Sequence, residues 1–467
     1  MLRRIIFSLL LAISITSVHA SDTEDKVING FRFQRTPETK IMIYDQTNRN
    51  IGNIFPENKL ELLDPFLIED TLIPALPSVF KEFSQIQEVK ILPDLDNHSG
   101  HLSASDGLLE PLLSHDIASI IVFSLEVLKD NDVTSLPVNT SLQHLWITFC
   151  TGKDDLIASR FTNLLSKLKA LKRLNIPERI AANIEPTSLA GLENLTLCVS
   201  ELDVKIQDIV QLPSLKRLHV NIRGNETDNI RKLAEGLKAR TSPLFLELSC
   251  DTLTESHFQT LFEKQKYPQI TGLNLSSGRM LTPQALFYMD SAFADNTLHT
   301  LVLDTPALKG EGLEIVVKSP YFKSLTCLSL PETTLNNQDV QPLMSSIATN
   351  TTLQVLRVGG SVTDVQPLLN GENTTLTALS LGGMQFDRPK VEGLFKLPGL
   401  TELDFKYYLK SGEKLLETFN NVRTSLTSLE RLYINGVGKK SEQTLVDILN
   451  KGDVTKPKSN HPFDKYF

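Results

Sequence analysis

A short hydrophobic pattern recurs along the chain: an apolar residue, two residues, a second apolar residue, one residue, and a third apolar residue. Twelve clear copies begin between Leu142 and Leu429, at intervals of 21 to 29 residues. Two weaker copies, Ile86-Val89-Ile91 and Ile117-Ile120-Val122, precede them. Recurrence at such a period is typical of repeat architectures, so we expect stacked units that bury one continuous core.

Each copy of the pattern predicts a β-strand. Alternate residues of a strand face opposite sides of a sheet, so the fourth and sixth residues of a unit should point into the core together. The third and fifth residues should then face outward. In the unit that begins at Leu298, Leu301 and Leu303 should be buried, whereas Thr300 should face outward.

The segments between the strands carry helical signals. Thr282-Pro283 joins a capping residue to a proline, which suits the first position of a helix. Leu286, Met289 and Phe293 then fall on one helical face. We predict similar helices over 227–240, 254–266, 336–350, 411–424 and 441–450. The shorter units 171–191 and 353–375 lack room for a full helix.

The repeated strand and helix resemble the leucine-rich-repeat family. The central repeats, with steps of 27 or 28 residues between Leu215 and Asn350, are similar to the ribonuclease-inhibitor type. The resemblance implies an α/β leucine-rich-repeat solenoid, with a curved parallel sheet on the concave face and helices on the convex face. Spacing supports the curvature, because strands lie ~4.8 Å apart whereas packed helices need roughly 8 to 10 Å. The resemblance also implies a protein ligand.

One feature of the family is mostly missing. Many such repeats carry Asn or Cys three residues after the last apolar position, where the side chain bonds neighbouring backbone groups. Cys150 fits this pattern, but Gly278 and Pro306 stand at the corresponding positions of later units. We therefore expect a weak ladder of buried polar bonds.

The first twenty residues predict a secretory signal. Arg3 and Arg4 precede an apolar run from 5 to 15, and Val18-His19-Ala20 offers small residues at the cleavage positions. We expect cleavage after Ala20 and a secreted or periplasmic protein. The alternative is an uncleaved anchor, although the run is too short to cross a bilayer comfortably. No later segment predicts a membrane span.

The remaining chain divides into three parts. Residues 21–85 do not fit the repeat and should form an N-terminal cap, with a strand at 40–44 and a helical region at 60–83. The leucine-rich-repeat solenoid should cover 86–452, with clear repeats from 142. A polar C-terminal tail should occupy 453–467.

Charge and cysteine content narrow the classes of function. The formal net charge of -8 gives no global field to attract nucleic acid. Cys150, Cys198 and Cys250 are separated by two repeat steps, and Cys327 lies further along the solenoid. Two steps place strands ~9.6 Å apart, beyond the ~7 Å limit on Cα separation for a disulfide. We therefore expect free thiols.

Two segments come close to known catalytic or metal-binding patterns without matching them. The segment 436–441 resembles a phosphate-binding loop but has Tyr433 in place of the first glycine and Lys440 between the key lysine and the serine. The segment 94–101 gathers four metal-ligand types, yet Ser99 and Ser105 replace the glycine and glutamate of a calcium loop. We therefore expect no catalytic site, no metal, no cofactor and no enzyme activity.

The outward positions of the early units predict where a partner binds. Trp146, the only tryptophan of the chain, stands there with Arg173 and Arg217, and both residue types are enriched at binding hot spots. We expect these three residues to form one protein-binding patch, with His219 and Phe245 beside it. The alternative is that Trp146 packs under the N-terminal cap.

The sequence thus favours a secreted, monomeric module for protein–protein interaction. The short signal and the lack of a cysteine-rich cap favour a bacterial source, and action on a host as an effector is a further hypothesis. The Asn-x-Ser/Thr sequences at Asn139, Asn350 and Asn373 would matter only in a glycosylating cell. Two alternatives stay open: a structural envelope protein without a specific partner, and an enzyme with its site in 21–141.

Overall fold

The computed structural model describes residues 26–28, 31–35, 40–44, 50–62, 73–91, 109–122, 133–147, 155–407 apart from short internal gaps, and 429–435. The predicted signal peptide, the predicted C-terminal tail and the helices predicted over 411–424 and 441–450 lie outside these residues. The chain forms two compact units: unit 1 comprises 1–197 and 203–205, and unit 2 comprises 198–202 and 206–467.

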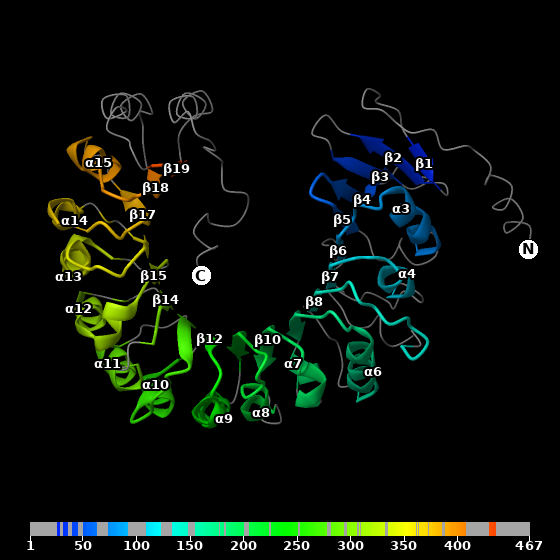
Figure 1. Ribbon diagram of the computed structural model, residues 1–467, viewed down its shortest axis with the longest axis horizontal. Coiled ribbons are helices and arrows are strands. Elements are labelled where there is room, and N and C mark those ends of the chain that lie inside the picture. The colour runs from blue at the N-terminus through cyan, green and yellow to red at the C-terminus, as the bar shows by residue number, and fades with distance from the viewer. Residues whose placement is uncertain are drawn as a thin grey trace, which may run out of the picture. The chain divides into compact units, whose positions relative to one another are not determined.

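In unit 1 the strands β1 to β5 pair antiparallel, and the strands from β5 onward pair in parallel. The strands are β1 (Lys26–Ile28), β2 (Phe31–Arg35), β3 (Ile41–Tyr44), β4 (Asn50–Phe55), β5 (Lys59–Leu62), β6 (Glu88–Ile91), β7 (Ser119–Val122), β8 (His144–Ile147), β9 (Arg173–Ile176) and β10 (Asn194–Val199). The helices are η2 (Ile73–Ala75), α3 (Leu76–Glu82), α4 (Leu109–Leu113), α6 (Asp155–Lys167), α7 (Glu178–Ala181) and η3 (Pro186–Leu189). Figure 1 shows α3, α4 and α6 on one side of β5 to β8.

Near the start of unit 1 the sequence-based expectation was partly wrong. The strand expected at 40–44 is β3, but the helical region expected over 60–83 begins with strand β5. Leu60 and Leu62 are buried on alternate positions, which is the period of a strand. Leu60 pairs in register with Val89 of β6, so the parallel arrangement already begins at β5. Helical structure starts at Ile73.

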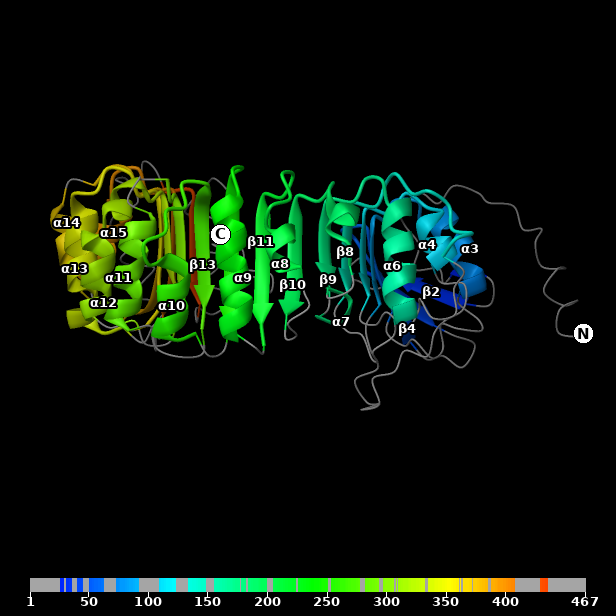
Figure 2. The same cartoon turned by 90° about the horizontal axis from the view of Figure 1, so that it is seen from below.

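In unit 2 every strand from β11 to β19 pairs in parallel with the next one. The strands are β11 (Arg217–Ile222), β12 (Leu244–Cys250), β13 (Ile270–Ser276), β14 (Thr300–Asp304), β15 (Cys327–Leu330), β16 (Val355–Val358), β17 (Ala378–Met384), β18 (Glu402–Tyr407) and β19 (Arg431–Asn435). The helices are α8 (Ile206–Ile209), α9 (Glu226–Ala239), α10 (Glu255–Phe262), α11 (Pro283–Ala292), α12 (Gly310–Lys318), η4 (Pro320–Ser324), α13 (Asn337–Ala348), α14 (Gln366–Asn370) and α15 (Arg388–Phe395). Helices α9 to α15 line the outer side of the strands of unit 2 (Figure 1) and run alongside them (Figure 2).

The strands of unit 2 share one register set by the fourth residue of each repeat. Leu301 pairs with Leu273 on one side and with Leu328 on the other, and all three are fully buried. The same row continues from Leu218 to Leu432 without a change of position. The predicted inward positions and the leucine-rich-repeat solenoid fold are therefore confirmed.

The helix signals also match the structure. The Thr282 hydroxyl accepts a hydrogen bond from the backbone N–H of Ala285, and Pro283 occupies the first turn of α11. At α13 the Asn336 side chain accepts from two backbone N–H groups. The short units hold only short helices, such as α14 (Gln366–Asn370).

Buried polar bonds, which we call the polar ladder, lie in the turns that precede three of the strands. The expected place for such bonds was the turn that follows each strand. Asn139, Asn350 and Asn373 stand three residues before the first leucine of their units. Each side-chain oxygen accepts from two backbone N–H groups in the turn that leads into its strand. The Asn139 amide donates to the Leu113 carbonyl (2.7 Å), and the Asn373 amide to the Ile347 carbonyl (2.7 Å). Each of these two amide bonds links a repeat to the one before it, whereas the expectation of a weak ladder concerned the positions after the strands and stays a prediction.

We call the sheet face opposite the helices the open face of each unit. In the middle of unit 2 its positions carry small side chains such as Ser329, Ala378 and Ser380, and these are buried. Ser380 donates to the Asp404 carboxylate at 2.7 Å, and both residues are buried. The accessible side chains of the open face therefore lie on other strands.

Candidate partner-binding site

The five predicted partner-binding residues fall in both units. Trp146 and Arg173 lie on β8 and β9 of unit 1, whereas Arg217, His219 and Phe245 lie on β11 and β12 of unit 2. All five stand on the open face, at the third or fifth position of their units, as the register requires. The structure brings together the residues within each group, and the single patch joining Trp146, Arg173 and Arg217 stays a prediction.

Trp146 is an exposed aromatic residue in the middle of a regular strand. Its side chain is 48% exposed, and its Cα partners are Ile121 of β7 and Asn175 of β9. A tryptophan packed under a cap would be covered, so the alternative prediction for this residue was wrong. On the open face of unit 1, Trp146 therefore offers a large apolar side chain to solvent.

Arg173 lies one strand away and is held by a neighbour. With the Asn194 amide in the orientation that satisfies both of its ends, its oxygen accepts from Arg173 Nε (3.1 Å) and its nitrogen donates to the Glu193 carbonyl (3.0 Å). Arg173 is exposed, and within the described part of the chain it has no ion pair with a carboxylate. Asn194 thus orients a guanidinium whose charge no carboxylate of the described residues compensates.

Several other charges among the described residues of unit 1 occur in pairs. Lys59 forms an ion pair with Glu61, and Lys90 lies 3.7 Å from Glu88. Lys172, beside Arg173 in the sequence, pairs with Glu193 at 3.2 Å. Among these cations Arg173 alone keeps its charge available.

His144 completes the surroundings of Trp146. It is the Cα partner of Arg173, and its pKa is lowered by burial and by the positive charge of that arginine. Near neutral pH the ring is therefore uncharged. A neutral imidazole can donate one hydrogen bond and accept another.

In unit 2 the predicted residues are engaged with one another. The Arg217 guanidinium lies 4.4 Å from the centre of the Phe245 ring and forms an ion pair with Glu247. The other side of the ring leans over Gly272, where a Cβ atom would come within 2.3 Å of Phe245 Cδ2. Phe245 is thus packed between Arg217 and a glycine, and the charge of Arg217 is compensated.

His219 belongs to the same arrangement. Its Nε2 lies 3.0 Å from the hydroxyl oxygen of Ser249, and burial lowers its pKa. The negative charge of Glu247 raises this pKa, while the positive charge of Arg217 lowers it further. The ring is therefore neutral near pH 7 and already has a polar partner.

Two features that matter here, Asn194 and the polar ladder, were missed from the sequence. Asn194 occupies the third position of its unit, as Arg173 does, so reading that position in every unit would have found it. The polar ladder also has a signal, since Asn-Thr-Ser/Thr-Leu recurs at Asn139, Asn350 and Asn373. Asn139 and Asn373 are buried and their amide nitrogens are bonded, so a glycan on either one is incompatible with this fold.

The remaining sequence predictions concern thiols, metals and membranes. Cys198, Cys250 and Cys327 are in no disulfide bond within the described residues, and Cys150 lies outside them. The segments 94–101 and 436–441 also lie outside them. In the part of the chain that the structure describes, no group of His, Cys, Asp or Glu is arranged to hold a metal ion. No helix described here combines the length and apolar character needed to cross a bilayer.

The similarity of this chain to known proteins is confined to solved structures. No protein-family model matches the sequence, and no curated protein matches it. Among solved structures, TLR13 in its complex with ssRNA13 aligns over 77% of this chain at 15% identity and a TM-score of 0.40. A leucine-rich-repeat protein of Leptospira interrogans aligns over 80% of this chain and 90% of its own, at 14% identity and a TM-score of 0.33. The chain spans about half (54%) of the TLR13 chain.

Proposed function

We propose that the chain is a protein–protein interaction module that binds a partner on the open face of unit 1, with Trp146 and Arg173 at the centre of the contact. The observation that carries the proposal is the 48% exposure of Trp146 on a rigid, hydrogen-bonded strand. Tryptophan and arginine dominate the energy of protein interfaces when a partner buries them together. Asn194 orients Arg173, and Trp146 stands on a hydrogen-bonded strand, which reduces the ordering cost of association.

The residues of unit 2 have a smaller part in this proposal. Arg217 is ion-paired with Glu247, and Phe245 is packed against Gly272. A partner that used them would have to compete with contacts already made. We therefore expect Arg217→Ala to weaken binding less than Arg173→Ala does.

The proposal includes export of the chain. The basic start, the apolar run and the small residues before Ser21 support a cleaved secretory signal. The mature chain would then be residues 21–467, and N-terminal sequencing of exported protein should begin at Ser21.

Affinity measurements on variants test the proposed site. Partners captured by the mature chain are identified, purified and titrated against the wild type and the variants Trp146→Ala and Phe287→Ala. Phe287 is a matched control, since it is an aromatic residue 58% exposed on helix α11. Trp146→Ala should weaken the affinity about 30-fold, the equivalent of a ~2 kcal/mol hot spot, whereas Phe287→Ala should leave it unchanged. Equal affinities for both variants would contradict the proposal and favour a structural role for the open face.

A further inference from the structure

We propose, resting on the proposed function, that the site in unit 1 recognises an extended partner segment carrying an Asp or Glu side chain two residues away from a large apolar side chain. The carboxylate would bind Arg173, and the apolar side chain would pack on Trp146. Three features of the described residues support this partner chemistry.

The first feature is the set of donors that Arg173 leaves free. A guanidinium carries five N–H groups, and the Nε–H is taken by Asn194. The two terminal amino groups remain, and they form a planar fork that matches the two oxygens of a carboxylate. Because Asn194 fixes the Nε side, the fork is presented in one orientation.

The second feature is the charge of the surface. Arg173 is the only formally charged residue at the third and fifth positions of β7 to β10, and His144 beside it is neutral near pH 7. One cation balances one carboxylate. Nucleic-acid backbones present many phosphates and need several cations along their path, and the net charge of -8 opposes them. A single acidic side chain therefore fits this surface better than RNA does.

The third feature is the spacing. His144 pairs with Arg173, so Trp146 lies one strand across from Arg173 and two residues further along. Strands lie ~4.8 Å apart and two residues advance ~6.6 Å, which puts the two Cα atoms about 8 Å apart. In an extended peptide, side chains on one face repeat every two residues, about 6.6 Å. An acidic residue and an apolar residue at positions i and i+2, in either order, can thus reach both side chains.

Selection from a random peptide library displayed on phage tests the inference. The mature chain should enrich peptides with Asp or Glu two positions from Trp, Phe, Tyr or Leu. Arg173→Glu should exchange the acidic preference for Lys or Arg and keep the apolar preference, whereas Trp146→Ala should lose the apolar preference. Arg231→Glu is the matched control, because this exposed arginine lies on helix α9, and it should select the same peptides as the wild type.

The outcomes separate the two proposals. For the best peptide, replacing Asp by Asn should weaken binding about tenfold to the wild type and have no effect with Arg173→Ala. Peptides that need Trp146 but show no acidic preference would overturn the inference and leave the proposed function standing. Loss of peptide binding on addition of single-stranded RNA, with RNA bound through Arg173, would also overturn it. If no enriched peptide depends on Trp146, both proposals fail.

Discussion

The side-chain amide of Asn373 donates a hydrogen bond to the backbone carbonyl of Asn350 at 2.8 Å, and Asn350 occupies the same position one repeat earlier. Both residues turn their side-chain oxygens toward the backbone N–H groups that lead into the following strand. One residue type thus shapes the turn within a repeat and, at Asn373, also ties that turn to the repeat before it.

Removal of this amide should destabilise unit 2. Asn373→Ala removes the amide bonds to the carbonyl groups of Ile347 and Asn350 and takes away the oxygen to which the N–H groups of Thr375 and Leu376 donate. We expect the free energy of unfolding to fall by about 1 to 3 kcal/mol in urea denaturation. Asn370→Ala, at an exposed position of α14, should change it by less than ~0.5 kcal/mol. Similar losses for both variants would show that the ladder contributes little.

The leucine row gives a second prediction. Leu301→Ala or Leu328→Ala removes a fully buried side chain between stacked repeats and should cost ~2 to 5 kcal/mol in denaturant melts. Thr300→Ala, one residue away on the half-buried open face, should cost under ~0.5 kcal/mol. Comparable costs at Thr300 and Leu301 would contradict the strand register.

The sequence was enough to predict this register because burial on alternate positions leaves a repeated apolar signature. It was not enough at Lys59–Leu62, where a four-residue strand lies beside an apolar helical region and the two periods are hard to separate. It also failed to show how side chains on the open face pair across strands. The packing of Phe245 between Arg217 and Gly272 joins three repeats, and the contact depends on their three-dimensional register.

A buried arginine provides a third prediction. The Arg240 guanidinium donates to the carbonyl oxygens of Val210 (2.5 Å), Leu212 (3.0 Å), Ser242 (2.8 Å) and Pro243 (3.1 Å), and also to that of Leu215. A lysine ammonium has three donors and no planar fork, so Arg240→Lys should leave several carbonyl groups unpaired. We expect a loss of about 2 to 3 kcal/mol in the free energy of unfolding.

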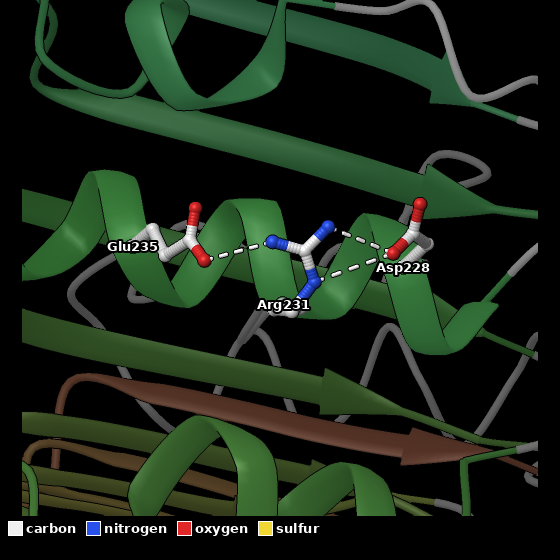
Figure 3. A network of polar contacts seen from close by, with 3 residues as sticks. All are labelled: Asp228, Arg231 and Glu235. Atoms are coloured by element: carbon white, nitrogen blue, oxygen red, sulfur yellow. Dashed lines mark hydrogen bonds and ion pairs between the residues drawn. The ribbon is translucent and has the colours of Figure 1, made fainter.

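The control for this variant is an arginine on the surface of the same unit. Arg231 pairs with Asp228 and Glu235 along helix α9 (Figure 3), at 2.8 Å in each case, and all three side chains are solvent-exposed. Exposed pairs of this kind contribute little, so Arg231→Lys should change the stability by less than ~0.5 kcal/mol. An equally small loss of stability for Arg240→Lys would show that the five carbonyl oxygens around Arg240 do not require a guanidinium.

The pKa of His144 gives a fourth prediction. Burial and Arg173 lower this pKa below the usual value of about 6.5, so the unfolded chain takes up the proton first as the pH falls. The contribution of His144 to stability is therefore complete above pH ~6.5 and is lost as the pH falls toward the lowered pKa. Arg173→Ala should raise the pKa of His144, measured by NMR titration of its ring protons. An unchanged pKa would mean that the two side chains do not interact.

The most direct test of a partner site at Trp146 uses the fact that this residue is the only tryptophan of the chain. Its fluorescence is recorded for the free mature chain and then during titration with a purified partner. The account predicts that the free protein emits at a wavelength typical of water-exposed indole and is readily quenched by acrylamide. Binding should then shift the emission to the blue and protect it, in step with the occupancy measured by calorimetry. Emission that is already blue-shifted in the free protein and unchanged at saturation with the partner would contradict the account.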